Sequence, residues 1–196
     1  FEHYDDDLTG TTPADEALHR NRDGDVVVTR AIDWLTGRTQ HPFFCWVHLY
    51  DPHSPYVDHH DRYGDQFRNR PYDAEIAFVD EQVGRLLTFL QTQGLEQQTL
   101  FIVVGDHGEG LDQHQERRHG QLLYNSTLHV PWVMAQPGTL PAGQRCATPV
   151  TVADLYPTVL EALHLNGETK ISGRSLLLAA QGQPLPPRPL YAETDE

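Results

Sequence analysis

The sequence predicts an α/β domain with a mostly parallel sheet flanked by helices. Short apolar runs, typical of buried strands, occur at residues 43–50 and 100–104. Amphipathic helical patterns at residues 25–37, 71–93 and 151–163 alternate with these runs. The run at 100–104 is apolar on both faces, as in a central parallel strand covered by helices.

The first half of the chain contains a helix followed by a strand. The helical stripe within residues 25–37 comprises Val26, Val27, Ala31, Trp34 and Leu35. Asp23 or Asp25 is the candidate N-cap. The aromatic and β-branched run at 43–50 follows Pro42 and ends at an Asp-Pro pair, which indicates a buried strand.

The second helix begins at Pro71 and ends before Gly94, with a strong apolar face between them. After the strand at 100–104, residues 130–134 predict another short strand. Thr151 is the expected cap of the last helix, in which Pro157 predicts a kink or a late start.

Two long polar loops, residues 51–71 and 105–128, follow the predicted strands at 43–50 and 100–104. Because the carboxyl ends of parallel strands meet at one edge of a sheet, we expect both loops there, where ligands bind. The histidines of the chain concentrate in these loops, and loops of this length are usually functional or mobile.

Composition excludes several classes of function. The 196 residues suffice for one globular core, and the net charge of −14 argues against a nucleic-acid partner. No apolar run reaches the roughly 18 residues of a membrane helix, and no motif indicates the compartment. Cys45 and Cys146 cannot form a disulfide framework and are interpreted as small buried side chains.

The second loop opens with Gly105-Asp106-His107-Gly108, directly after the predicted strand. A carboxylate and an imidazole at the end of a rigid strand can form half of a divalent metal site. Further histidines follow at positions 114 and 119, so we predict metal-dependent chemistry in this loop.

These motifs resemble the sulfatases, which belong to the alkaline phosphatase-like superfamily. The stretch VVGDHGEGLDQHQERRHG at 103–120 is similar to their metal-binding signature, and FFCWVHLYDPHSPY at 43–56 is similar to their Asp-Pro-His loop. PYDAEIAFVDEQVGRLL, HVPWVM and DLYPTVLEAL follow in the family order, so the resemblance extends over nearly the whole chain.

The resemblance implies a role for each matching residue. Asp106 and His107 would bind a divalent cation, most commonly calcium, with magnesium, manganese or zinc as alternatives. His119 and His53 would be catalytic and would contact the transferred sulfuryl group. Two glycines that are common in the family are replaced here by Asp112 and Gln115, so the loop is expected to differ in shape.

The family's nucleophile motif, Cys/Ser-x-Pro/Ala-x-Arg with formylglycine, is absent from the chain. Residues 5–7 are three aspartates that follow no apolar strand, and we interpret them as loop rather than as the family's first metal ligands. We therefore expect residues 1–196 to be the later part of a sulfatase-like catalytic domain. The missing N-terminal half would lie upstream and supply the formylglycine, and the isolated chain would be an inactive fragment.

Two alternative functions stay open at the level of sequence. Phosphoethanolamine and phosphoglycerol transferases, and phosphodiester or phosphonate hydrolases of the same superfamily, also have a histidine 13 residues after the aspartate, as His119 follows Asp106. A non-catalytic binding module is the third interpretation. The leading hypothesis is hydrolysis of an anionic sulfate ester.

Overall fold

The computed structural model describes residues 2–7, 21–168 and 170–194. The chain divides into two compact units, residues 1–95 and 96–196, which are described separately. In the described part, no helix is both long enough and apolar enough to span a bilayer.

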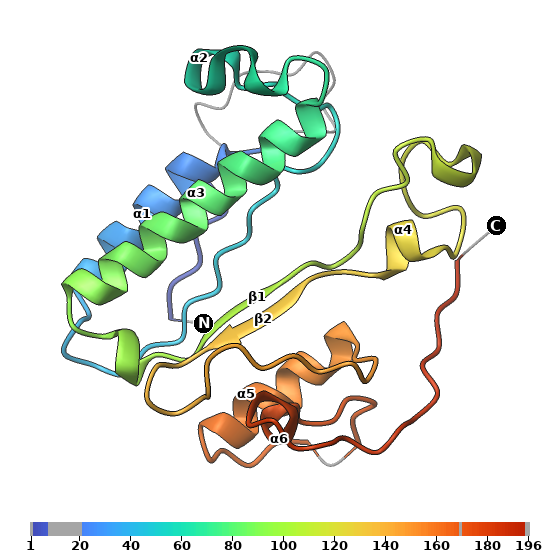
Figure 1. Ribbon diagram of the computed structural model, residues 1–196. Coiled ribbons are helices and arrows are strands. Elements are labelled where there is room, and N and C mark those ends of the chain that lie inside the picture. Colours follow the sequence, from blue (N-terminus) through green and yellow to red (C-terminus); the bar gives the residue numbers. More distant parts are fainter. Residues whose placement is uncertain (1, 8–20, 169, 195–196) are drawn as a thin grey trace. The chain divides into compact units, whose positions relative to one another are not determined.

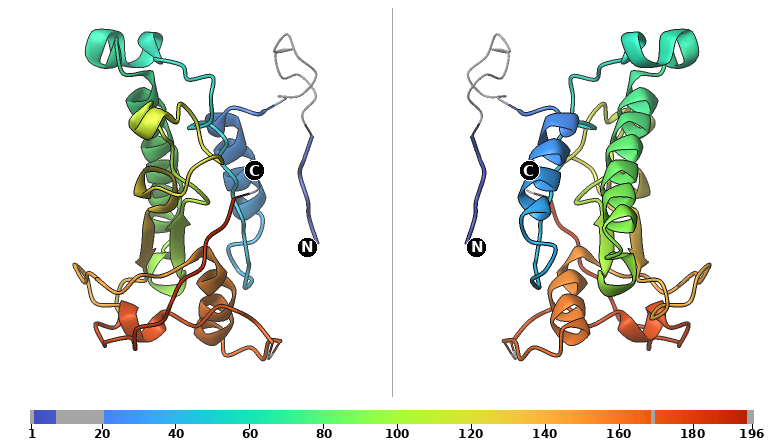
Figure 2. Two further views of the ribbon diagram at one scale, coloured as in Figure 1. Left: turned by 90° about the vertical axis from the view of Figure 1, so that its right-hand side faces the viewer. Right: turned by 90° about the vertical axis from the view of Figure 1, so that its left-hand side faces the viewer.

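The first unit is helical. Helix α1 (Gly24–Thr36) packs beside α3 (Pro71–Thr92), and Figures 1 and 2 show the two lying side by side. The short helix α2 (His60–Tyr63) and the 3-10 turn η1 (Gly64–Phe67) precede α3. Both long helices were predicted from their apolar periodicity, and both are confirmed within one or two residues.

The contact between α1 and α3 forms the core of the first unit. The buried apolar side chains are Val28, Leu35, Ala74, Phe78, Leu86 and Leu90. Glu75 and Gln82 on α3 are buried as well, although both are polar, whereas the apolar Ile76 of the same helix is 45% exposed. The buried face of α3 is therefore rotated relative to the face that hydrophobicity alone indicates.

The predicted strand at 43–50 does not form in the described structure. Its side chains alternate in exposure, and Phe44 and Trp46 are 55% and 72% exposed. A strand requires a neighbouring strand to satisfy its backbone, and none is described in residues 1–95. The prediction of a buried strand is therefore wrong for this structure.

The second unit contains the strands β1 (Phe101–Val104) and β2 (Trp132–Ala135). They pair antiparallel, with Phe101 opposite Ala135 and Val104 opposite Trp132. Residues 105–131 contain only the 3-10 turn η3 (Gln113–Gln115) and the short helix α4 (Asn125–Leu128). Without a crossover helix the chain returns along the neighbouring strand in the opposite direction. The mostly parallel sheet is thus not confirmed, because the pairing among the described residues is antiparallel.

Short helices complete the second unit. The 3-10 turns η2 (Glu96–Gln98) and η4 (Val152–Asp154), and helices α5 (Leu155–Ala162) and α6 (Leu177–Ala180), flank the strands in sequence. Thr151 and Asp154 form the reciprocal capping box of η4, as predicted for Thr151, and α5 begins late, with Pro157 in its first turn. Leu176, Ala179 and Leu185 form a small core against Trp132 and Val150.

A buried ion pair fixes the end of the second unit. The Asp154 side chain is fully buried, and both of its oxygens accept hydrogen bonds from Arg188 Nη2. Asp154 also accepts from the backbone amides of Thr151 and Arg174. With this many donors the buried carboxylate is well satisfied, and residue 188 is attached to the start of α5.

Candidate functional site

The loop after β1 carries three of the predicted site residues. Asp106 and His107 directly follow β1, and Asp106 Oδ1 accepts a hydrogen bond from the His107 amide at 2.9 Å. His107 Nδ1 donates to the Gly108 carbonyl at 2.9 Å, so the other ring nitrogen, Nε2, is the one available as a ligand. That atom lies 3.9 Å from Asp106 Oδ2.

His119, near the other end of the loop, lies beside His107. Its ring stacks on the ring of His107, with centroids 3.9 Å apart and an angle of 30° between the planes. The structure therefore brings together Asp106, His107 and His119, to which the resemblance assigned metal-binding and catalytic roles; those roles stay a prediction. We call these three residues and Glu109 the β1 cluster.

Glu109 is the member of the β1 cluster that sequence reasoning missed. Its side chain is buried, and Oε1 lies 3.3 Å from His119 Nδ1 and 3.2 Å from the Gly110 amide. The signal was present, because Glu109 stands inside the quoted motif two residues after His107. A buried carboxylate bonded to one nitrogen of an imidazole fixes its tautomer and ring orientation.

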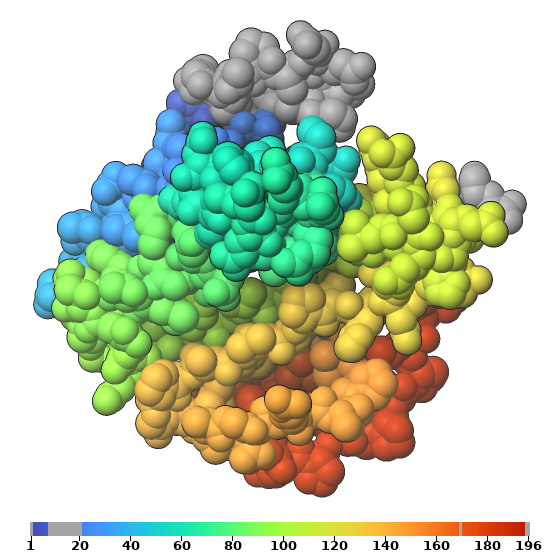
Figure 3. All heavy atoms as spheres, turned by 45° about the horizontal axis from the view of Figure 1, so that its top comes forward, coloured from blue at the N-terminus to red at the C-terminus, as the bar shows by residue number. Residues whose placement is uncertain are grey.

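Close backbone contacts fold the loop back on itself. The Gly110 amide donates to the Arg118 carbonyl at 2.7 Å. A Cβ atom at Gly110 would lie 2.3 Å from the Glu116 carbonyl oxygen, so only glycine fits. The buried Glu116 Oε1 accepts from the amides of Gln121 and Leu122, which holds the chain just after His119. Figure 3 shows the yellow-green atoms of this loop gathered in one lobe.

The middle of the loop has an unusual backbone. Leu111, Asp112, His114 and Gln115 all have positive φ, between 49° and 66°. Asp112 and Gln115, which replace glycines common in the family, both adopt the left-handed conformation that glycine favours. The side chain of His114 stacks on Tyr124, with centroids 3.7 Å apart, so His114 has a packing contact of its own.

His53 lies in the first unit, in the loop that leads to α2. Its backbone amide donates to the Tyr50 carbonyl at 2.9 Å, and its ring stacks on the Tyr50 ring at 4.5 Å. His53 Nδ1 donates to the Ser54 carbonyl at 2.7 Å. That His53 meets the β1 cluster at one edge of a sheet stays a prediction.

The donor atoms of Asp106 and His107 fit part of a cation site. Two ligands of one cation, each about 2.0–2.4 Å from it, lie roughly 3–4 Å apart, which matches the 3.9 Å between Oδ2 and Nε2. Donation of the second imidazole N–H to a backbone carbonyl is also the usual arrangement of a metal-binding histidine. No group of three or more such ligands occurs within the described ranges, so this pair would be an incomplete set.

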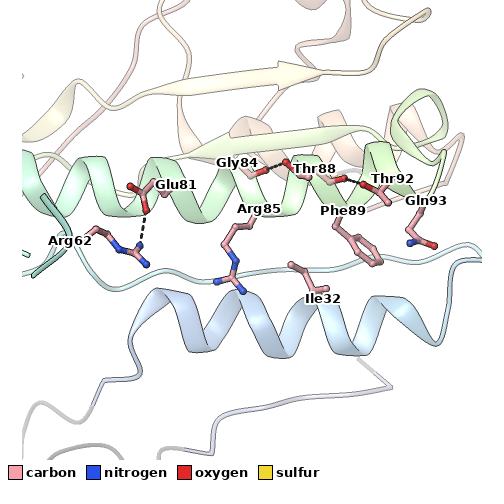
Figure 4. Close-up of a pocket in the computed structure, with 9 residues that line it drawn as sticks. All are labelled: Ile32, Arg62, Glu81, Gly84, Arg85, Thr88, Phe89, Thr92 and Gln93. Atoms are coloured by element: carbon pink, nitrogen blue, oxygen red, sulfur yellow. Dashed lines mark hydrogen bonds and ion pairs between the residues drawn. The ribbon is translucent and has the colours of Figure 1, made fainter.

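A groove of the first unit lies apart from these residues. It has a volume of about 640 Å³ and runs between α1 and α3, where Arg62 and Glu81 form an ion pair at 2.7 Å (Figure 4). Its remaining lining residues are Ile32, Gly84, Arg85, Thr88, Phe89, Thr92 and Gln93. None of the predicted site residues lines this groove.

Comparison with known proteins decides the family. The family model for sulfatases matches residues 3–165. The chain belongs to the sulfatase family. An arylsulfatase of Clostridium perfringens is 31% identical over 108 residues, which are 54% of this chain and 22% of that protein.

Solved structures support the fold. The putative sulfatase yidJ from Bacteroides fragilis superposes with a TM-score of 0.73 and 21% identity, over 84% of this chain and 42% of that one. The phosphonate monoester hydrolase from Silicibacter pomeroyi superposes with a TM-score of 0.52 and 26% identity, over 61% of this chain and 26% of that one. The chain thus spans about a fifth of the curated relative and less than half of either solved neighbour.

The two cysteines correct a smaller prediction. Cys146 is exposed and Cys45 is only half-buried, and both are thiols. Burial raises the pKa of the Cys45 thiol. Neither residue is the fully buried side chain that the sequence suggested, and neither occurs in the nucleophile motif of the family.

Proposed function

We propose that this chain is the later part of a hydrolase domain that cleaves sulfate esters. The observation that carries the proposal is the β1 cluster, in which a carboxylate and two stacked imidazoles from a sulfatase signature lie together. Transfer of a sulfuryl group develops negative charge on its oxygens, and positive groups held at that place lower the barrier.

Each residue has a defined task in this proposal. Asp106 Oδ2 and His107 Nε2 would hold part of a divalent cation, calcium by resemblance to the family, which when bound supplies positive charge to the ester oxygens. His119, oriented by Glu109, would contact a sulfuryl oxygen or donate a proton to the leaving oxygen. His53, with Nδ1 engaged by the Ser54 carbonyl, would present Nε2 to the same group.

The remaining groups would come from outside this chain. The sequence has no formylglycine motif, and two cation ligands do not complete a calcium shell of six to eight oxygens. We therefore propose that the isolated 196-residue chain is inactive and binds metal weakly. Robust arylsulfatase turnover by the purified chain would refute this.

Phosphonate or phosphodiester hydrolysis is the second candidate, favoured by the structural similarity to the phosphonate monoester hydrolase. An aryl sulfate and an aryl phosphonate, assayed side by side with the full-length protein, separate the two activities. A catalytic efficiency at least tenfold higher on the phosphonate would overturn the sulfatase proposal.

Substitutions in the full-length protein test the site itself. Asp106→Ala and His119→Gln should each lower kcat about a hundredfold or more, since each removes a group that stabilises the transition state. Asp112→Asn and His114→Gln are matched controls from the same loop, outside the β1 cluster, and should keep kcat within about threefold. Full activity in Asp106→Ala would show that the site is misassigned. A full-length protein without turnover that binds calcium in calorimetry would favour the binding-module interpretation.

A further inference from the structure

The turn that carries His53 has a second feature, which the proposed function does not use. Residues 50–53 form a tight turn closed by the hydrogen bond from the His53 amide to the Tyr50 carbonyl. We call this segment the His53 turn. Asp51 occupies its second position, two residues before His53, and its side chain points away from solvent into the first unit.

The Asp51 carboxylate binds the beginning of helix α1. Oδ1 accepts a hydrogen bond from the Gly24 amide at 2.7 Å, and Gly24 is the first residue of the helix. The first amides of a helix have no partner within it and carry partial positive charge, so a carboxylate is favourable there. The N-cap residue Asp23 makes no side-chain cap bond, and the bond to the first amide comes instead from Asp51, 27 residues after Gly24.

The contact is close enough to require glycine on the helix side. A Cβ atom at position 24 would lie 2.7 Å from Asp51 Oδ2 and 3.0 Å from its Cγ. Oδ2 itself is buried and has no hydrogen-bond partner in the described structure. Burial raises the pKa of the Asp51 carboxyl, and the bond from Gly24 opposes that rise. A buried acid with one strong partner is costly for stability alone.

A second buried carboxylate holds the other end of the same loop. Glu75 of α3 is 3% exposed, accepts from the Val57 amide at 2.8 Å and lies 3.0 Å from His59 Nε2. The segment from residue 50 to residue 59 is therefore attached to α1 at one end and to α3 at the other. His53 lies between the two attachments, so both hydrogen bonds restrict the path of the backbone that carries it.

We propose that Asp51 is a positioning residue, which sets the place of the His53 ring by joining the His53 turn to the first amide of α1. The inference rests on the proposed function, because it assumes that His53 contacts the transferred group. In this proposal Asp51 and Gly24 affect turnover only by positioning His53. If Asp51 were only a structural cap of α1, its substitution would lower the stability of the protein whether or not His53 is present.

A double-substitution experiment in the full-length protein tests the proposal. Asp51→Ala should lower kcat on an aryl sulfate about 30- to 100-fold, since displacement of a catalytic group by 1 Å can cost about a hundredfold. Gly24→Ala should have a similar effect from the other side of the contact. Asp51→Asn keeps an acceptor at Oδ1 and should retain kcat within about threefold, as should the control Asp25→Asn in the same first turn of α1.

The deciding measurement is made in the His53→Ala background. If Asp51 acts through His53, Asp51→Ala should cause no further loss of kcat there, because the two effects are not additive. An equal loss in both backgrounds would overturn the proposal. If His53→Ala alone leaves kcat unchanged, the assigned role of His53 is wrong, which is a separate failure of the proposed function. Should Asp51→Ala not fold, the same comparison is made with Gly24→Ala, and full kcat in a folded Gly24→Ala protein would also overturn the proposal.

Discussion

The strained loop of the β1 cluster yields a quantitative prediction about stability. Gln115 has a φ of 66°, a conformation that costs an L-residue about 1–2 kcal/mol relative to the right-handed one. Gln115→Gly removes that cost but loses about 0.5–1 kcal/mol through the greater freedom of glycine in the unfolded chain. The net change should be a stabilisation of about 0.5–1 kcal/mol, or a rise in Tm of about 1–4 °C for a chain of this size.

Thermal and urea unfolding of the 196-residue chain, followed by circular dichroism, measure this change. The matched control is Gln113→Gly, two residues earlier in the same loop, where φ is not positive. There the substitution should destabilise by about 0.5–1 kcal/mol, because it removes no strain. If Gln115→Gly lowers Tm as much as Gln113→Gly does, the backbone of the loop does not store the strain described here.

Three further predictions concern other parts of the chain. Arg188→Met should lower the free energy of unfolding by about 3 kcal/mol or more, because it leaves the buried Asp154 carboxylate without its cation. Urea unfolding measures this change, and a loss below about 1 kcal/mol would contradict the prediction. The ion pair with Arg22 lowers the pKa of Asp5 to about 2, so Asp5 should contribute stability above its ordinary pKa of 3.8 that is lost as pH falls through about 2. A carbon-detected NMR titration checks this, and Arg22→Gln should return the Asp5 pKa toward 3.8. With a thiol reagent at pH 8, the exposed Cys146 should react well before the half-buried Cys45. Equal rates would show that burial does not protect Cys45.

The sequence was sufficient for elements with a strong local pattern. Apolar periodicity together with Pro71 and Gly94 located α3, and Thr151 correctly marked the cap before α5. The resemblance to the sulfatases implied related roles for Asp106, His107 and His119, and the structure brings those three residues together. These features depend on residues near one another in the chain, or on a motif that contains them all.

Tertiary structure decided which distant groups meet. Asp23 is the N-cap residue of α1, as expected, but the carboxylate that accepts from the first helix amide is that of Asp51, because any carboxylate that reaches this amide can bind it. The strand at 43–50 was expected from its composition, but a strand exists only where a neighbour pairs with it.

The direction of pairing between β1 and β2 likewise followed from the return of the chain after residue 104, which hydrophobicity does not encode. Sequence alone thus indicated the family, the long helices and three of the four residues of the β1 cluster, Asp106, His107 and His119. The buried partners Asp51, Glu75 and Glu109 were decided only by the folded structure, because burial and hydrogen bonding at long range are properties of packing.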